Sequence, residues 1–419
     1  MHWKFLNDHY RIRMRILYVI SYYKPAYVYG GPAKSVPALC EGLVKLGAGV
    51  SVFTTNANGK GHLSVPLHTP IDVDGVSVSY FPLAMGGMNF YSPQLGAVIR
   101  SQAGYFDLIV AEGIWEYALS PVVWAGLRYH VPFIITVRGQ LFPWSLKKGF
   151  LKKQLFMFLF AHRYIDNAAG LQVSDNVEAK AVARFGWKTP IFIVPNGLDL
   201  SCYQNLPARG HLRSKLGIAE NQKLLLFLGR LNHIKRPDIA IYSLAFAKKQ
   251  GFQVSLVLAG PDEDGLTRNL IEFAKKNDCS ENVYFTGLLT GDQILEALAD
   301  ADLLLMPSEV QESFGMATVE AMAAGLPVLV SEGVPAGYWA ERAGAGKVVP
   351  CDRQCFAQST CELLSSQGTM IEMGKQGREL ANSRFEIRRV AEKLLDQFQS
   401  IVDTGRPIFE TEYSISTLL

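Results

Sequence analysis

The sequence predicts an α/β protein made of two Rossmann-like domains whose parallel sheets face each other across a cleft. Short apolar runs typical of buried strands alternate with helical patterns along most of the chain, which favours parallel sheets covered by helices. This alternation starts twice, at Met14 and again at Lys223. The 419 residues are also enough for two domains of roughly 200 residues, each with its own core.

The strands are predicted from runs rich in Val, Ile, Leu and Phe. They lie at 14–20, 50–55, 76–81, 108–111, 132–137, 170–174 and 191–194 in the first series, and at 223–228, 254–259, 283–288, 304–306 and 328–330 in the second. We expect the first domain to span 1–205 and the second 206–385, with a linker near 200–221 and a helix in the final part, 386–419.

Composition and charge exclude several classes of protein. A net charge of +3 and a pI near 8.4 are too mild to predict a nucleic-acid partner. The six cysteines are scattered and match no zinc pattern, so we expect free thiols in a reducing compartment. The start of the chain lacks a secretory pattern, and no apolar run reaches the ~18 residues of a spanning helix. We therefore expect a cytoplasmic protein, free or attached to the inner face of the membrane.

The segment 304–330 carries the main chemical signal. A strand ends at Pro307, a polar loop holds Glu312, and a helix is predicted from Met316 to Ala324. Eight residues correspond to about 800° of helix, so Glu320, on the second turn, cannot face Glu312 as an acid/base pair of the hydrolase kind.

The start of this predicted helix favours a phosphate. Gly315 permits close backbone approach, and the first amides of the helix, those of Gly315, Met316 and Ala317, lack acceptors within it. Unpaired N–H groups and the helix dipole both attract anions. Two carboxylates beside a phosphate site can bind the hydroxyls of a sugar and a ribose.

Glu312 and Glu320, set among Pro-Ser, Phe314-Gly315 and Glu-Ala-Met-Ala-x-Gly, resemble the Glu-x7-Glu signature of glycosyltransferase family four. The resemblance implies a retaining enzyme with the two-domain GT-B fold. It implies that Glu312 lies at the donor sugar, that Glu320 holds the nucleotide ribose, and that the segment from Phe314 to Ala317 binds diphosphate and sugar. It also implies that the final helix crosses back to the first domain.

The strand ends of the second domain add two cations to this resemblance. Arg230 and Lys235, five apart after Gly229, can both turn to one diphosphate, because the guanidinium binds oxygens in pairs and the ammonium acts as a point charge. The pattern Gly-Arg-Leu-x-x-x-Lys again resembles the family, which implies that both cations hold the donor diphosphate. By the same resemblance, Gly287 lies near the nucleotide base.

Two places in the first domain are candidate ligand contacts. Gly30 and Gly31 separate the first strand from the first helix. At this place an α/β sheet approaches a ligand, or the glycines form only a flexible connection between strand and helix. Their spacing lacks the G-x-G-x-x-G pattern, which argues against a dinucleotide-dependent oxidoreductase.

Arg138 follows a buried strand, at the place where the resembled family has a histidine that touches the donor sugar. It is predicted either to bind the donor phosphate or an anionic acceptor, or to shape the loop through an ion pair.

The stretch 145–163 predicts a helix that is both basic and apolar. Its nearly all-round apolar pattern after Leu155 favours a core helix with a solvated lysine end. The alternative is an interfacial helix on anionic lipid, giving peripheral membrane contact through 145–163.

Two Asp-x-Asp sequences, Asp72-Val73-Asp74 and Asp300-Ala301-Asp302, are better explained by turn and capping bonds than by a metal.

The predicted function is retaining transfer of a sugar from a nucleotide diphosphate sugar, a UDP- or GDP-sugar, to a glycan or lipid-linked acceptor. Arg230, Lys235 and Glu312 are the predicted catalytic residues, and neither a metal nor a further cofactor is expected. Bacterial surface polysaccharide or glycolipid synthesis is the expected setting. The alternatives are a sugar-nucleotide epimerase on the same architecture and a nucleotide-sugar-binding protein without catalysis.

Overall fold

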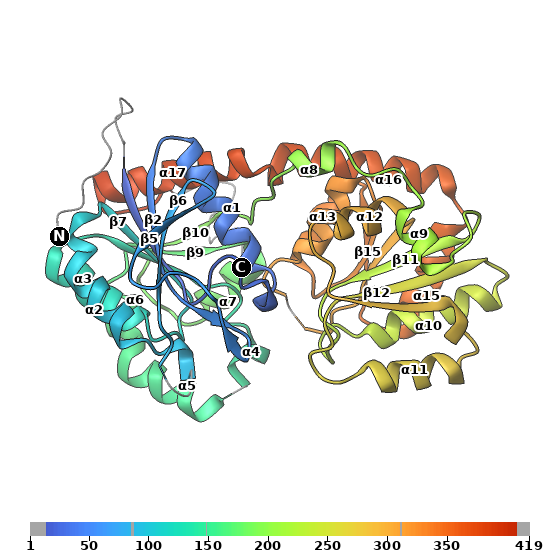
Figure 1. Cartoon of the computed structure of the whole chain (residues 1–419), viewed down its shortest axis with the longest axis horizontal. Helices are drawn as coiled ribbons and strands as arrows, with labels where there is room; N and C mark the ends of the chain where they lie inside the picture. Colours follow the sequence, from blue (N-terminus) through green and yellow to red (C-terminus); the bar gives the residue numbers. More distant parts are fainter. Residues whose placement is uncertain (1–13, 85–87, 148, 311, 409–419) are drawn as a thin grey trace. The chain divides into compact units, whose positions relative to one another are not determined.

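A computed structural model describes residues 14–84, 88–147, 149–310 and 312–408, and the chain forms two compact units. Unit 1 comprises Met1–Gly197 and Ile387–Leu419, and unit 2 comprises Leu198–Glu386. Each unit contains a mainly parallel sheet with helices on both faces (Figure 1), so the α/β prediction is confirmed. Residues 1–13 and 409–419 lie outside the described residues.

Unit 1 is built on an eight-stranded sheet, coloured blue to green in Figure 1. In sheet order its strands are β10 (Ile191–Ile193), β9 (Gly170–Val173), β8 (Phe133–Thr136), β7 (Leu108–Glu112), β1 (Arg15–Val19), β2 (Gly49–Thr55), β6 (Val76–Phe81) and β5 (Pro70–Val73). Only β5 is antiparallel, and it joins β6 through a turn in which Asp72 Oδ1 accepts from the amide of Gly75 at 3.1 Å. The parallel-sheet prediction did not include this hairpin.

The helices of unit 1 pack on both faces of the sheet. They are α1 (Pro32–Lys45), α2 (Pro93–Gln102), α3 (Leu119–Tyr129), α4 (Pro143–Lys147), α5 (Phe150–Phe156), the π-helix η4 (Met157–Ala161), α6 (His162–Ile165), α7 (Asn176–Ala183) and α17 (Ile387–Thr404). Along β1, Ile16 and Tyr18 point to the core shared with α1 and α17, while Leu17 and Val19 point to the core shared with α2 and α3.

Short elements complete unit 1. They are the 3-10 helices η1 (Tyr27–Tyr29), η2 (Met88–Phe90) and η3 (Ala103–Tyr105), and the two-stranded ribbon of β3 (Ala57–Asn58) and β4 (Gly61–His62). None of the described helices in either unit is both long enough and apolar enough to pass through a membrane.

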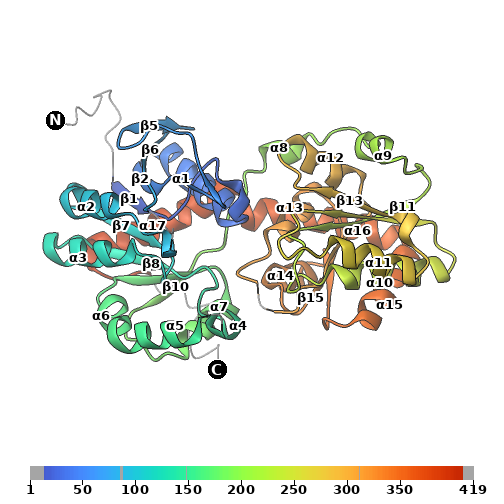
Figure 2. The same ribbon diagram turned by 60° about the horizontal axis from the view of Figure 1, so that its bottom comes forward.

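Unit 2 is built on a six-stranded, fully parallel sheet. In sheet order its strands are β13 (Val283–Gly287), β12 (Val254–Ala259), β11 (Lys223–Leu228), β14 (Leu303–Met306), β15 (Val328–Ser331) and β16 (Gly346–Val349). Its helices are α8 (Ser201–Gln204), α9 (His211–Leu216), α10 (Pro237–Lys249), α11 (Thr267–Lys276), α12 (Asp292–Asp300), α13 (Met316–Ala324), α14 (Pro335–Arg342), α15 (Arg353–Leu364), α16 (Gln367–Leu380), the 3-10 helix η5 (Ser280–Asn282) and the π-helix η6 (Ala381–Phe385). Figure 2 shows this sheet from another side, with α10 and α11 on one face and α12 and α13 on the other.

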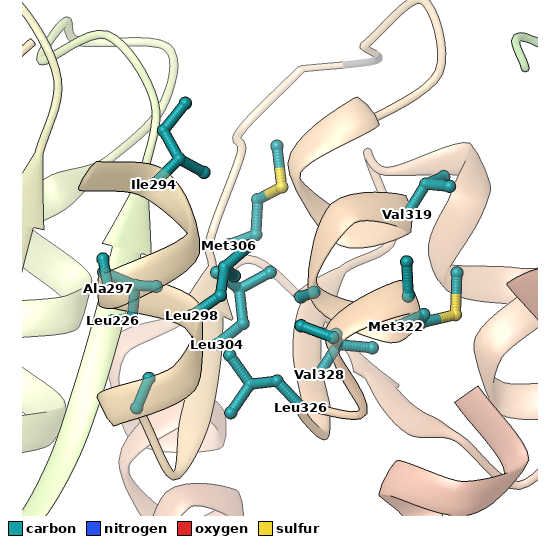
Figure 3. Close-up of a cluster of buried hydrophobic side chains, with 14 of the residues drawn as sticks. Leu226, Ile294, Ala297, Leu298, Leu304, Met306, Val319, Met322, Leu326 and Val328 are labelled. Atoms are coloured by element: carbon teal, nitrogen blue, oxygen red, sulfur yellow. The ribbon is translucent and has the colours of Figure 1, made fainter. Parts of the chain in front are cut away.

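Buried side chains fix helix α13 against this sheet. Figure 3 shows Val319 and Met322 of α13 in the same cluster as Leu304 of β14 and Val328 of β15. All four are at most 3% exposed. This packing holds the N-terminus of α13 near the carboxyl end of β14, because only a short loop joins the two.

The start of unit 2 differs from the linker predicted at 200–221. Helices α8 and α9 lie there, and Tyr203 and Leu212 are buried in the core of unit 2. The unit therefore begins at Leu198, and the predicted boundary at 205 falls inside it. A polar composition suggested a linker, but the buried Arg213 explains part of that polarity, since its guanidinium donates to the carbonyl oxygen of Asp300 at 2.9 Å.

The second Asp-x-Asp sequence holds this segment in place. Asp300 Oδ2 accepts from the amide of Arg213 at 2.8 Å, in the first turn of α9. Asp302 accepts from Arg213 at 3.0 Å and from the amide of Leu224 at 2.7 Å. Both carboxylates thus serve capping and pairing roles, as the sequence predicts. The described residues contain no group of three or more His, Cys, Asp or Glu side chains arranged to hold a metal ion.

Candidate functional site

The predicted strand, loop and helix around the two glutamates are present in unit 2. Helix α13 spans Met316–Ala324, so Glu312 lies in the loop before it and Glu320 on its second turn. Gly315, the residue before the helix, has φ +94, and a Cβ there would lie 2.5 Å from Cγ1 of Val334. This position therefore needs glycine for both its conformation and its space.

Lys235 and Glu312 meet at this loop. The ammonium nitrogen Nζ of Lys235 lies 2.6 Å from Oε1 of Glu312, and the side chains are 16% and 12% exposed. The hydroxyl of Ser308 also donates to Oε1 of Glu312. Two of the three predicted catalytic residues are therefore in direct contact, and a third side chain, which sequence reasoning did not single out, orients the carboxylate.

Arg230 follows the same strand end as Lys235 but pairs with a different acid. Its Nη1 lies 2.6 Å from Oε1 of Glu263, and both side chains are exposed to more than 40%. Asn232 links the two cations: its Nδ2 donates to Glu263 at 2.7 Å, and its Oδ1 accepts from the amide of Lys235 at 2.9 Å. Glu263 was not predicted, although its place just after the strand end at Ala259 could have indicated it.

Glycines bring the backbones of three neighbouring strand ends together. The amide of Gly229, after β11, donates to the carbonyl of Ala259 at 2.9 Å, and the amide of Gly260, after β12, donates to that of Gly287 at 2.8 Å. A Cβ on Gly260 would lie 1.8 Å from the carbonyl oxygen of Gly229. The Lys235 side chain passes this edge, with Cδ and Cε 3.9 Å from where a Cβ on Gly229 would lie.

The N-terminus of α13 offers backbone donors rather than side chains. The first amide of this turn with a backbone acceptor is that of Thr318, which donates to the carbonyl of Gly315 at 3.0 Å. The preceding amides of Gly315, Met316 and Ala317 have no acceptor within the helix. Phe314 is fully buried, and its ring packs edge-on against Phe385 at 5.6 Å. Its side chain serves the core, and its carbonyl oxygen accepts from the amide of Ala336 at 2.9 Å.

Glu320 lies in a more enclosed place than Glu312. It is 7% exposed and stands close enough to Tyr203 of α8 to help burial raise the pKa of that phenol. Glu320 also helps to raise the pKa of the Cys202 thiol, after burial and Asp199. Because α8 belongs to unit 2, these groups form the surroundings of Glu320 within one unit.

In unit 1, Arg138 is bound to a glutamate that sequence reasoning did not name. Its Nε lies 2.8 Å from Oε2 of Glu112 and its Nη2 lies 3.1 Å from Oε1, a bidentate pair. Its Nη1 donates to Oδ1 of Asn196. Arg138 has φ +53, and the next amide, that of Gly139, donates to the buried Glu178. The contacts support the predicted alternative in which an ion-paired arginine shapes this loop.

Gly30 and Gly31 lie at the start of α1, also in unit 1. Gly30 has φ +79, and its carbonyl accepts from Ala33, while that of Gly31 accepts from Lys34 and Ser35. A Cβ on either glycine would meet no atom within 4 Å. The two glycines therefore form an open turn, and only Gly30 needs the left-handed conformation.

A buried carboxyl group lies beside the Arg138 loop. Oε1 of Glu116 accepts from Nε2 of Gln140 at 2.7 Å, and Oε2 has no partner in the described structure. Burial raises the pKa of Glu116 to about 7. Gln140 also accepts from the amide of Ile114 at 2.7 Å, so it holds the loop after β7 against the loop after β8. A glutamate just after a buried strand was the available signal for this group.

Comparison with known families covers most of the chain. Residues 209–380 match the family described as "Glycosyl transferases group 1", and residues 30–197 match the "Glycosyl transferase 4-like domain". The first match lies within unit 2 and the second within unit 1.

Individual relatives agree with these matches. The chain is 29% identical to the D-inositol 3-phosphate glycosyltransferase of Mycolicibacterium smegmatis, over 69% of this chain and 68% of that one. It is 27% identical to the enzyme of the same name from Saccharomonospora viridis, over 87% and 88% of the two chains.

Solved structures with the GT-B fold are similar to most of the chain. HepE of Anabaena, solved with UDP and glucose, has a TM-score of 0.72 at 20% identity, covering 92% of this chain and 100% of that one. Sucrose-phosphate synthase of Thermosynechococcus elongatus has a TM-score of 0.73 at 18% identity, covering 93% and 100%. These likenesses support the fold predicted from the sequence.

Proposed function

The chain belongs to the group 1 glycosyl transferases, and from this premise we propose that it moves a sugar from a nucleoside diphosphate sugar to an acceptor hydroxyl with retention of the anomeric configuration. The observation that carries the proposal is the contact between Lys235 and Glu312 in the loop before α13. It supports the proposal because a cation and a carboxylate meet in the loop before a helix N-terminus within unit 2.

The donor would bind by its charges and its hydroxyls. Arg230 and Lys235 would hold the diphosphate together with the first amides of α13. Glu320 would accept from the ribose, and Gly287 would leave room for the base. HepE has been solved with UDP-glucose, and a UDP-sugar or a GDP-sugar is the donor class that we propose for this chain.

Catalysis would be electrostatic. The bond from the anomeric carbon to the diphosphate breaks, and the negative charge that develops on the leaving oxygen is stabilised by the two cations and the helix terminus. Oε1 of Glu312 already accepts from Lys235 and Ser308, so Oε2 is the oxygen that can orient a donor-sugar hydroxyl. The leaving phosphate would take the acceptor proton as the acceptor attacks from the same face. We propose no metal and no further cofactor in this step.

We propose a glycan or lipid-linked acceptor, and a role in bacterial surface polysaccharide or glycolipid synthesis at the cytoplasmic face of the membrane. One similar structure is WaaG, a glycosyltransferase involved in lipopolysaccharide biosynthesis, with a TM-score of 0.64. The names of the sequence relatives favour a second acceptor class, a phosphorylated cyclitol, because they are D-inositol 3-phosphate glycosyltransferases.

The test is a transfer assay with the full chain. UDP- and GDP-sugars are first screened by thermal shift, since a ligand at ~100 times its Kd stabilises by about 2.7 kcal/mol. The stabilising donor is then incubated alone, with D-inositol 3-phosphate, and with lipid and glycan extracts. The proposal predicts an acceptor-dependent product with the donor's anomeric configuration. A changed sugar without acceptor would identify an epimerase, and tight binding without turnover a sensor.

A further inference from the structure

Helix α5 and the π-helix η4 expose an apolar face on the outside of unit 1. Leu151, Leu155 and Leu159 are 81%, 59% and 52% exposed, and the spacing of four places them on one side of the helix. Phe150 and Phe160 are 53% and 42% exposed. The core role predicted for this helix is therefore wrong for this face. We call these five side chains the outer face.

A different set of side chains attaches the helix to unit 1. The ring of Phe156 lies 5.5 Å from that of Trp115 and 5.8 Å from that of Tyr164, centroid to centroid. Phe156 and Met157 pack against the buried cluster that contains β1 and α3 residues. Phe160 joins this inner row, since its ring lies 5.8 Å from the rings of both Phe156 and Tyr164. Phe150 and the three leucines are therefore the part of the outer face that the aromatic packing does not use. Exposed apolar surface of this kind marks an interaction site.

The sequence that carries the outer face is basic, and the first acidic residue after Glu116 is Asp166, which lies 3.2 Å from His162. From Tyr117 to Ile165 the sequence contains no Asp or Glu. It contains seven basic side chains, Arg128, Arg138, Lys147, Lys148, Lys152, Lys153 and Arg163. Two of the seven are used inside the unit: Arg138 pairs with Glu112, and Lys153 donates to the carbonyl of Ser145 at 2.6 Å. Lys147 and Arg163 are exposed at the two ends of the helical stretch.

We propose that α5 and η4 form a docking surface for an anionic lipid bilayer. Phe150 and the three leucines of the outer face enter the boundary between headgroups and acyl chains, and the exposed Lys147 and Arg163 contact anionic headgroups. A second copy of the chain is a poorer occupant. A two-fold contact would bring the same basic segment of each copy together, and Asp166, the nearest acidic residue that follows it in the sequence, already pairs with His162.

Trp115 links the docking surface to the loop that follows strand β8. The indole Nε1 donates to the carbonyl of Gln140 at 3.2 Å, and the ammonium of Lys153 lies 5.1 Å from the centre of the ring. Gln140 lies in the same loop as Arg138, after β8, and its Nε2 donates to Glu116 in the loop after β7. Docking would therefore place this loop near the bilayer. The inference goes beyond the proposed transfer reaction and does not depend on it.

The test is co-sedimentation of the full chain with lipid vesicles. One set contains phosphatidylcholine alone, and the other an equal mixture of phosphatidylcholine and phosphatidylglycerol. We expect binding to the mixed vesicles that weakens with added salt, and little binding to the neutral ones. The double variant Leu151→Glu, Leu155→Glu should lower the partition coefficient about tenfold or more. Its thermal midpoint should stay near that of the wild type, because both leucines are exposed.

The matched control is Ile371→Glu. This residue lies on α16 in unit 2 and is 55% exposed, so the same change in chemistry should leave vesicle binding unchanged. The proposal is overturned if the wild type binds neither vesicle, or if the double variant binds as the wild type does. It is also overturned if light scattering shows that the wild type is a dimer and the double variant a monomer, and the wild type does not bind vesicles. A transfer assay on a water-soluble acceptor separates these results from the proposed enzymatic function.

Discussion

The ammonium nitrogen of Lys235 lies 2.6 Å from Oε1 of Glu312, although 77 positions separate the two residues in the chain. Parallel neighbours β11 and β14 bring their following loops to the same edge of the sheet, which is why the residues meet. The pair is mostly buried, so its attraction is less screened than that of a surface pair. A bound diphosphate would meet a cation that Glu312 has already positioned.

Replacing Lys235 with alanine should slow transfer more than it unfolds the chain. The variant loses one cation aimed at the leaving diphosphate, so kcat/KM is expected to fall by about 100-fold or more. Steady-state kinetics with the identified donor measures the effect. The control is Lys347→Ala, which removes a lysine that also lies 2.6 Å from a glutamate, Glu362, in the same unit. Equal losses in both variants would mean that the Lys235 effect is not specific to the site.

Replacing Glu263 with glutamine should strengthen donor binding. Arg230 is paired with Glu263 at 2.6 Å, and the guanidinium must leave this exposed carboxylate before it can bind a diphosphate. Exposed pairs of this kind contribute up to ~1 kcal/mol, so the Kd for UDP or GDP is expected to fall by roughly two- to fivefold. Isothermal titration measures it. Weaker nucleotide binding would instead make Glu263 a direct contact of the donor.

Replacing Glu320 with alanine should weaken nucleotide binding and remove the protein's preference for a ribose over a deoxyribose. The carboxylate is 7% exposed, and hydroxyl bonds to a charged acceptor are worth enough to change Kd by about tenfold or more. The measurement compares the nucleoside diphosphate with its deoxyribose analogue in wild type and variant. The wild type should prefer the ribose form, and the variant should bind both alike. A preference that survives in the variant would assign the ribose to another residue.

Replacing Glu116 with glutamine should reduce the loss of stability at high pH. Burial raises the pKa of Glu116 from 4.5 to about 7, so the folded state holds the proton more tightly than the unfolded one. Its contribution to stability is present below pH 4.5 and is lost as the pH rises through 7. Glutamine mimics the protonated form. The thermal midpoint of Glu116→Gln minus that of the wild type should therefore become more positive from pH 5 to pH 8, roughly the span over which such a group titrates.

A matched change elsewhere controls for this pH effect. Glu272→Gln alters a glutamate on α11 whose side chain is 56% exposed, and it should keep the wild-type pH profile. Some pH dependence will remain in Glu116→Gln, because burial also raises the pKa of Glu178 to about 7. A profile for Glu116→Gln that is parallel to the wild type over this range would contradict a buried proton on Glu116.

Local patterns were sufficient to predict most of the fold. The helix predicted from Met316 to Ala324 has those bounds in the structure, because glycines flank it at both ends and apolar strands precede and follow it. The strand predicted at 223–228 is likewise observed with the same bounds. In both cases the signal is continuous in sequence and needs no knowledge of distant partners.

Partners that are distant in sequence were not predictable in the same way. Arg138 could have been a ligand-binding residue, and only the fold brings Glu112 and Asn196 to it. Phe314 stands within the signature segment, but its ring lies in the core. The apolar residues after Leu155 predicted a buried helix, because periodicity does not distinguish a side that packs on the core from a second apolar side facing out.

The central claim is that the donor diphosphate binds at the N-terminus of α13 beside Lys235. A crystal structure of the full chain with UDP or GDP, whichever gives the larger thermal shift, tests it most directly. We expect phosphate oxygens within hydrogen-bonding distance of the Lys235 ammonium and of the Met316 or Ala317 amide, with the ribose at Glu320. Phosphates bound away from both Lys235 and this helix end would contradict the account.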